Sequence, residues 1–133
     1  MTRFLLSASV ALLALCNTAG AADQGRPTQK EVVVAVSDVY IPGGFDSETD
    51  VYVIVSGMFP NSCYNWAGAD IDMKQQESLV QVTSKATVSQ GMCLTVLVPY
   101  TKEVRIGKLN SGKYTLRFPS PDGTYFDREL VVE

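Results

Sequence analysis

The feature that most constrains this chain is a series of short runs rich in β-branched and aromatic residues, each ended by a turn signal. Strands are expected at residues 31–39, 51–58, 67–77, 79–88, 93–98, 102–109, 113–118 and 124–132. Branched side chains such as valine favour extended backbone, and turn signals at these intervals are typical of a β-sandwich. The pattern predicts an all-β sandwich of seven or eight antiparallel strands.

Two of these runs also predict which side chains face the core. In the run 51–58, valines alternate with Tyr52 and Ile54, so both faces are apolar and an inner strand is expected. In the run 79–88, apolar side chains at even positions alternate with Gln81, Thr83 and Lys85, which indicates a half-buried strand.

The first 21 residues have the three parts of a cleavable secretory signal. Arg3 precedes an apolar stretch, residues 4–15, which is shorter than the ~20 residues that span a bilayer. Small residues around Ala21 then provide a cleavage site. We therefore expect a signal peptide at 1–21, a flexible lead-in at 22–30 and a domain at 31–133. The mature protein is expected to be secreted or periplasmic, with no transmembrane segment after cleavage.

Cys16 raises the alternative of a lipid anchor, because it lies at the end of the apolar stretch. Bacterial lipidation sites usually place a small residue directly before the cysteine, and here the bulky Leu15 occupies that position. This argues against a lipoprotein.

The two cysteines that follow the leader, Cys63 and Cys93, are expected to form a disulfide because exported proteins fold in an oxidising compartment. The bond would close a loop of about 30 residues, to which the chain-entropy model assigns ~3–4 kcal/mol of stability.

A resemblance supports the fold class. The segment from Gly107 to Phe118 contains glycine, leucine, the turn Asn110-Ser111-Gly112 and the alternating Tyr114-Thr115-Leu116. It resembles the last hairpins of small secreted bacterial immunoglobulin-like domains, which implies an immunoglobulin-like sandwich. The chain departs from the antibody pattern, because Trp66 follows Cys63 by only three positions. The resemblance therefore implies a fold and no functional residue.

The composition excludes several function classes. The leader holds one of the 11 basic residues and none of the 14 acidic ones, so the mature chain has a net charge of −4. Without a basic patch, no nucleic-acid partner is expected. Histidine is absent, which removes the commonest general base and zinc ligand. The nearest pair of carboxylates, Asp70 and Asp72, would share a solvated strand face. We therefore expect no enzyme and no catalytic residue.

An acidic loop is a candidate calcium site. Asp46, Glu48 and Asp50 alternate as the first ligands of a calcium loop do, and extracellular sites can be as weak as ~10⁻⁴–10⁻³ M. A helix–loop–helix site is excluded because Val51 stands where its turn needs glycine. Apart from calcium, no cofactor is expected; solvated charge on a loop explains the same residues.

The aromatic residues around Cys63 are a candidate binding site. Phe59, Tyr64 and Trp66 lie close together in the sequence, and exposed aromatic residues mark interaction sites or stack on sugar rings. The alternative is that they pack over the disulfide and close the core. These features favour a non-enzymatic exported binding or accessory domain with a protein or glycan partner. The alternative function is an inhibitor of an exported hydrolase that presents the disulfide-held loop 60–66.

Overall fold

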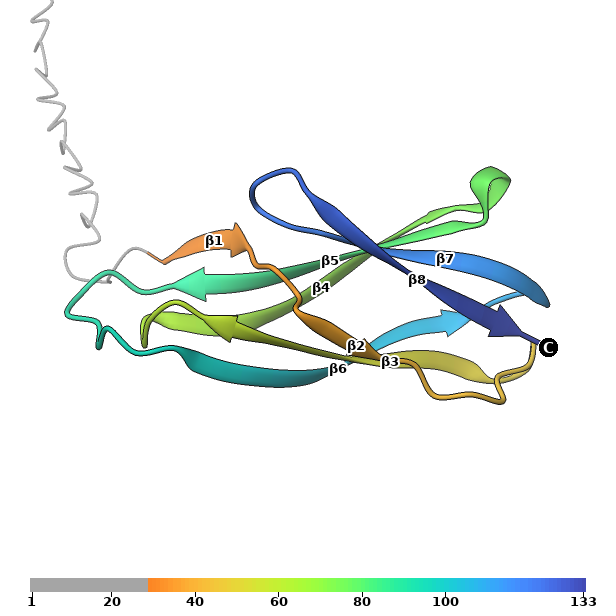
Figure 1. Ribbon diagram of the computed structural model, residues 1–133, viewed down its shortest axis with the longest axis horizontal. Coiled ribbons are helices and arrows are strands. Elements are labelled where there is room, and N and C mark those ends of the chain that lie inside the picture. The colour runs from red at the N-terminus through yellow and green to blue at the C-terminus, as the bar shows by residue number, and fades with distance from the viewer. Residues whose placement is uncertain (1–28) are drawn as a thin grey trace, which may run out of the picture.

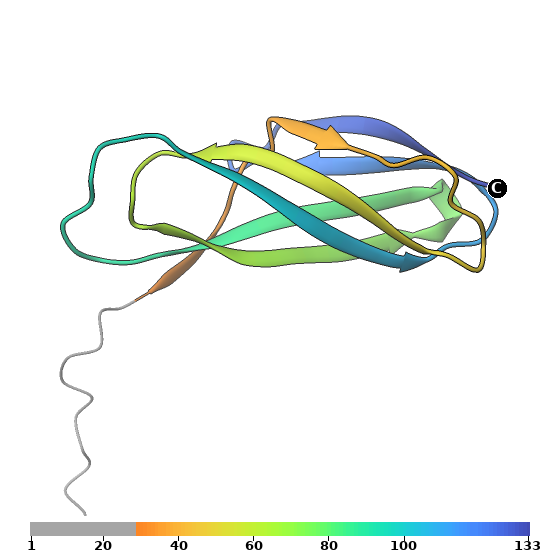
Figure 2. The ribbon, with the colours of Figure 1, turned by 90° about the horizontal axis from the view of Figure 1, so that it is seen from below.

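The computed structural model describes residues 29–133, which form eight strands and one short 3-10 turn, Gln75–Glu77. The predicted signal peptide 1–21, Cys16 and residues 22–28 of the predicted lead-in lie outside the described residues. The strands form two sheets stacked as a β-sandwich (Figures 1 and 2). The predicted all-β sandwich of seven or eight strands is thereby confirmed. Within 29–133, no helix has the length and apolar character needed to cross a membrane.

The smaller sheet has three strands in the order β2 (Asp38–Tyr40), β3 (Asp50–Phe59) and β6 (Val98–Lys108). β3 lies between the other two, as its two apolar faces predicted, and pairs with β6 along its whole length. β6 pairs with no other described strand and forms a long edge of this sheet.

The larger sheet is built around β5 (Leu79–Val88), a strand that the sequence predicted with these bounds. β4 (Tyr64–Lys74) pairs with β5 along one edge. The other edge of β5 is shared by β1 (Lys30–Val33) and β7 (Gly112–Pro119). β8 (Tyr125–Val132) pairs with β7 and completes the sheet.

One pair of strands is parallel, whereas the sequence predicted antiparallel strands throughout. β7 runs parallel to β5 over Leu79–Gln81, and the other strand pairs are antiparallel. Parallel neighbours require a crossover connection, which the chain provides by passing through β6 in the opposite sheet.

The predicted first strand, residues 31–39, is in fact two strands in different sheets. β1 belongs to the larger sheet and β2 to the smaller one, and the chain crosses between them at residues 34–37. Val34 and Val36 in this crossing are buried in the core. A run of valines indicates extended, buried backbone, but it does not show that the chain changes sheets.

Residues 93–98 and 102–109 were predicted as separate strands, with Pro99 as the break. Residues 93–97 instead form a loop, and a single strand, β6, runs from Val98 through Pro99 to Lys108. An edge strand tolerates proline, because only one side of the strand is paired. β4 also begins earlier than predicted, at Tyr64.

The core lies between the two sheets. β3 contributes Val51, Val53 and Val55, and β5 contributes Val80 and Val82, all fully buried. The predicted inward orientation of the even positions of β5 is confirmed by this burial. β7 and β8 add Leu116, Phe118 and Leu130 to the same core.

Candidate functional site

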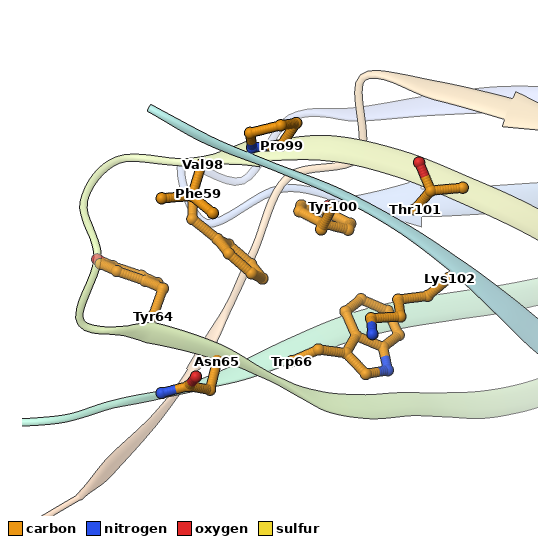
Figure 3. Close-up of a pocket in the computed structure, with 9 residues that line it drawn as sticks. All are labelled: Phe59, Tyr64, Asn65, Trp66, Val98, Pro99, Tyr100, Thr101 and Lys102. Atoms are coloured by element: carbon orange, nitrogen blue, oxygen red, sulfur yellow. The ribbon is translucent and has the colours of Figure 1, made fainter. Parts of the chain in front are cut away.

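A cleft of about 320 Å³ opens on one side of the sandwich, between β4 and β6 (Figure 3). Both are edge strands, of the larger and the smaller sheet respectively, and no backbone ladder joins them. The lining residues come from the end of β3, the start of β4 and the first half of β6. The cleft therefore lies between the edges of the two sheets.

The three aromatic residues proposed from the sequence come together at this cleft. The rings of Phe59 and Tyr64 stack with centroids 5.8 Å apart. Phe59 also stacks on Tyr100 at 4.5 Å, and Trp66 lies 5.5 Å from the same tyrosine. Phe59 is buried, whereas Tyr64 and Trp66 are half-buried and pack against the core. Phe59 thus packs between Tyr64 and Tyr100, and Tyr64 and Trp66 form one wall of the cleft (Figure 3).

Tyr100 is the centre of this cluster and was missed from the sequence. Its side chain is 5 % exposed, and its hydroxyl donates a 2.6 Å hydrogen bond to the carbonyl oxygen of Ala35. Burial raises the pKa of Tyr100 to about 12. Because Ala35 lies in the segment that crosses between the sheets, Tyr100 fastens that segment to β6. Its alternation with Val98 and Val104 would have revealed it, had β6 been recognised as a continuous strand.

Lys102 occupies an unusual position on β6. Inward-facing residues alternate along this strand, and Tyr100 and Val104 on either side of Lys102 are both buried. Lys102 is exposed and lines the cleft with Trp66 of β4 (Figure 3). None of the ion pairs among residues 29–133 includes Lys102. The cleft therefore contains one cationic side chain without a carboxylate partner in this part of the chain.

The disulfide ties the loop after β5 to the turn after β3. Cys63 and Cys93 are bonded, with Cα atoms 5.3 Å apart. Ser62 N donates to the carbonyl of Leu94 at 3.1 Å, and Leu94 N donates to Ser62 Oγ at 2.7 Å. Ser89 N donates to the carbonyl of Cys63 at 2.9 Å. The predicted disulfide is confirmed, and hydrogen bonds on both sides of it fix the loop.

The loop held in this way, residues 92–97, is here named the apolar loop. Four of its side chains project into solvent and are 52 to 104 % exposed: Met92, Leu94, Val96 and Leu97. The sequence predicted a strand at 93–98, so the exposure of this apolar run was not expected. The predicted presenting loop 60–66 is divided between two elements: residues 60–63 form the turn after β3, with Pro60 and Ser62 exposed, and Tyr64–Trp66 already belong to β4.

The structure does not gather the three carboxylates of the acidic loop. Asp46 Oδ1 accepts hydrogen bonds from the Thr49 hydroxyl at 2.6 Å and from Glu48 N at 2.9 Å, and these bonds lower the pKa of Asp46. Asp50 instead faces Arg105, with 3.4 Å between Oδ2 and Nη2. Within the described range, no three His, Cys, Asp or Glu side chains are placed to hold a metal ion.

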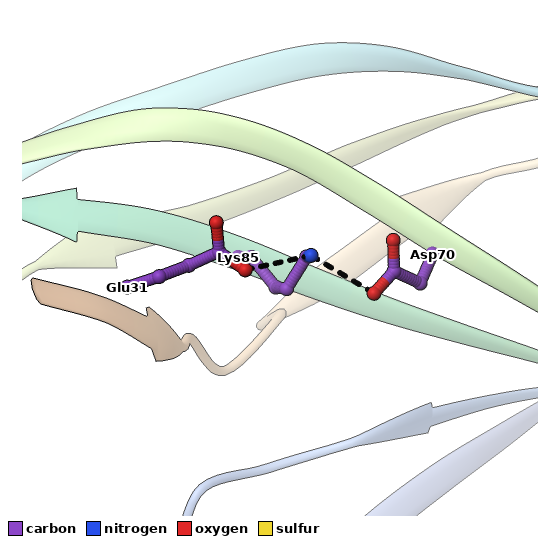
Figure 4. A network of polar contacts seen from close by, with 3 residues as sticks. All are labelled: Glu31, Asp70 and Lys85. Carbon is purple, nitrogen blue, oxygen red and sulfur yellow. Dashed lines mark hydrogen bonds and ion pairs between the residues drawn. The ribbon is translucent and has the colours of Figure 1, made fainter.

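A polar network on the outer face of the larger sheet joins three strands (Figure 4). Lys85 Nζ on β5 contacts Glu31 of β1 at 2.7 Å and Asp70 of β4 at 2.9 Å. The bonds to Glu31 and then Asp70 raise the pKa of Lys85. Both ion pairs of Lys85 lie within the sheet, so this cluster joins strands rather than forming a binding site. It includes Asp70, one of the two carboxylates considered as a catalytic pair in the sequence.

Comparison with known families decides the family of the chain. Residues 53–131, more than half of the chain, match the model of the ORF11 beta-sandwich domain. The chain belongs to the ORF11 β-sandwich domain family. The ORF11 match begins within β3 and ends within β8, so it contains the cleft, both bonded cysteines and the apolar loop. No match was found among the curated proteins or among the solved structures.

Proposed function

We propose that the mature protein is a non-enzymatic, exported binding domain that recognises a protein partner through the apolar loop. One observation carries the proposal: apolar side chains stand exposed on a loop that a disulfide and flanking hydrogen bonds hold in place. Exposed apolar groups of this kind mark interaction sites, and a preorganised loop loses less entropy when it binds.

The composition around the loop favours a protein partner. No charged residue occurs between Lys85 and Lys102, and the exposed side chains include methionine and leucine. The centres of protein interfaces are similarly depleted in charge and enriched in methionine. Segments that bind membrane surfaces usually combine apolar residues with lysine or arginine, which this loop lacks.

Export is supported by two independent features. The first 21 residues have the parts of a secretory signal, and the only two cysteines after them lie where they can bond. We infer a periplasmic or extracellular location and an immunoglobulin-like relationship, the latter supported by the two-sheet sandwich and the hairpin pattern around Asn110-Ser111-Gly112.

Site-specific photo-crosslinking in intact cells tests this function. A photoreactive residue replaces Leu94 in the apolar loop, or Tyr40, which is equally exposed on β2 and serves as the control. The proposal expects one specific protein adduct from position 94 and none from position 40. Adducts that are the same at both positions, or none at position 94, would overturn it.

The identity of the adduct then distinguishes an accessory role from inhibition. If the partner is an exported hydrolase, its activity is measured with and without the purified domain. Reduced activity establishes the inhibitor, now acting through residues 92–97 rather than 60–66. Unchanged or raised activity establishes an accessory subunit.

A further inference from the structure

The position of Lys102 is unusual for a lysine. It stands on β6 between two buried inward-facing residues, Tyr100 and Val104, where a core side chain would be expected. A lysine can protect an edge strand from pairing with another chain. At this position, however, it also places an ammonium group at a cleft in which the described residues supply no anion.

The wall opposite Lys102 is aromatic and held in place. Trp66 and Tyr64 are half-buried, and their rings rest on Tyr100 and Phe59 respectively. A β-bulge follows Trp66 directly, because Trp66 pairs with Ala86 while Gly68 pairs with the next residue, Lys85. Bulges of this kind redirect a side chain next to a site. Among the described residues, the cleft therefore combines a preorganised aromatic surface with one lysine that has no ion-pair partner.

The two polar neighbours of this aromatic surface face away from it. Asn65 on β4 and Thr101 on β6 border the cleft, but they alternate with Trp66 and Tyr100 and point to the opposite face (Figure 3). Thr101 Oγ1 lies 3.5 Å from Ser56 Oγ on that face, so Lys102 is the polar side chain that faces the aromatic wall. The volume of about 320 Å³ lies at the lower end of the ~300–1,000 Å³ range of small-ligand sites. This size suits one or two sugar rings rather than an extended polymer.

A peptide that adds as an extra strand fits these edges poorly. β6 carries Pro99, which lacks a backbone donor, and the inward-facing Lys102; β4 is interrupted by the bulge before Gly68. Each of these features is a known protection of a sheet edge against strand addition. The cleft is therefore suited to a compact ligand that contacts side chains.

We propose that this cleft binds an acidic sugar residue of a glycan. The apolar face of the sugar ring packs on Trp66 and Tyr64, and its carboxylate pairs with Lys102. Aromatic rings combine a large apolar surface with a polar tip, which suits an amphipathic ring, and charge-assisted bonds to a carboxylate are among the stronger hydrogen bonds. This site is separate from the protein contact proposed for the apolar loop and goes beyond it.

The test uses Trp66 as its reporter, because it is the only tryptophan in the protein. An array of glycans containing uronic or sialic acids, beside neutral glycans, first selects the acidic glycan with the strongest signal. That glycan and its carboxyl-reduced form are then titrated into the mature domain, followed by Trp66 fluorescence and calorimetry. The variants are Lys102→Gln and Tyr64→Ser, and Lys113→Gln, an exposed lysine on β7, is the control.

We expect the acidic glycan to change Trp66 fluorescence and to bind about tenfold more tightly than its carboxyl-reduced form, one charge-assisted bond being the difference. Lys102→Gln should remove that difference, Tyr64→Ser should weaken both ligands, and Lys113→Gln should change neither. Failure of every acidic glycan to bind, or equal affinity for both forms in the wild type, would overturn the proposal.

The glycan site and the protein-binding loop can be tested independently. The double variant L94S/L97S in the apolar loop should bind the glycan as the wild type does. Lys102→Gln should leave the photo-crosslink from position 94 unchanged. Loss of glycan binding in L94S/L97S would contradict the assignment of the glycan to the cleft.

Discussion

Gly57 lies directly across from Tyr100 in the β3–β6 ladder, and its lack of a side chain leaves the space that the tyrosine ring fills. A Cβ atom at this glycine would lie 2.6 Å from Cζ and 2.7 Å from Cε1 of Tyr100, and closer still to the hydroxyl. The ring is stacked on Phe59 and hydrogen-bonded to Ala35, so moving it aside would break these contacts. The close approach therefore favours glycine at this position.

Gly57→Ala is therefore expected to destabilise the domain by about 1–3 kcal/mol, the usual cost of forcing an extra carbon into a packed core. Denaturant unfolding measures the loss. Gly43→Ala is the matched control, because a Cβ there meets nothing within 4 Å. Equal stability of the two variants would show that Tyr100 does not occupy the space beside Gly57.

Tyr100 should make the domain sensitive to alkali. Tyrosine ionises near pH ~10 in an unfolded chain, whereas burial raises the pKa of Tyr100 to about 12. Between these pH values only the unfolded state releases the phenolic proton of Tyr100. The free energy of unfolding is therefore unaffected by this group below pH ~10 and falls as the pH rises toward about 12. The loss amounts to at most about 3 kcal/mol.

Tyr100→Phe tests this effect. At neutral pH the variant should lose about 1 kcal/mol, because the hydrogen bond to Ala35 is removed. Its stability should then fall less steeply than that of the wild type from pH 10 to 12, measured by denaturant unfolding at each pH. Tyr40→Phe, at an exposed tyrosine, should follow the wild type. Parallel profiles for all three proteins would refute the role of Tyr100.

Ser84 offers an opportunity to stabilise the domain. It is fully buried on β5, and its Oγ has no hydrogen-bond partner among the described residues. Because an unsatisfied buried hydroxyl costs free energy, Ser84→Ala should leave stability unchanged or raise it by about 1 kcal/mol. Ser37→Ala, which loses a bond to the Ser56 carbonyl, should not stabilise. A clear loss in Ser84→Ala would reveal an unrecognised partner.

The disulfide should contribute a large share of the stability. It joins residues 30 positions apart, for which the chain-entropy model gives ~3–4 kcal/mol. C63A/C93A should lower the unfolding midpoint accordingly while the far-ultraviolet spectrum remains that of a β protein. A variant as stable as the wild type would mean that the backbone hydrogen bonds beside the disulfide, those of Ser62 and Ser89, constrain the loop without it.

Local patterns predicted the sandwich and most of its strands correctly, because alternation and turn residues are properties of neighbouring positions. The alternation in Leu79–Val88 placed β5 with its correct inward face. The errors concern relationships between distant segments. Valines on both sides of residues 34–37 hid a change of sheet, and Pro99 appeared to end a strand that in fact continues along an edge.

The same distinction applies to the candidate site. The aromatic group around Cys63 was visible because its members are close in sequence, and the structure does bring Phe59, Tyr64 and Trp66 together. Tyr100 and Lys102 could not be connected to them, because their approach depends on how β6 pairs with β3. The apolar loop was predicted as a strand, because an apolar run has the same composition in a buried strand and in an exposed loop.

Binding through the apolar loop is tested by the affinity of the photo-crosslinked partner for the wild-type domain and for L94S/L97S. Leu94 and Leu97 are exposed, so the double variant should fold and unfold at the wild-type temperature. We expect its affinity for the purified partner to fall about tenfold or more, because apolar anchors are lost, whereas Tyr40→Ser should bind normally. Equal affinity of all three proteins would contradict the claim that the disulfide-held apolar loop is the binding surface.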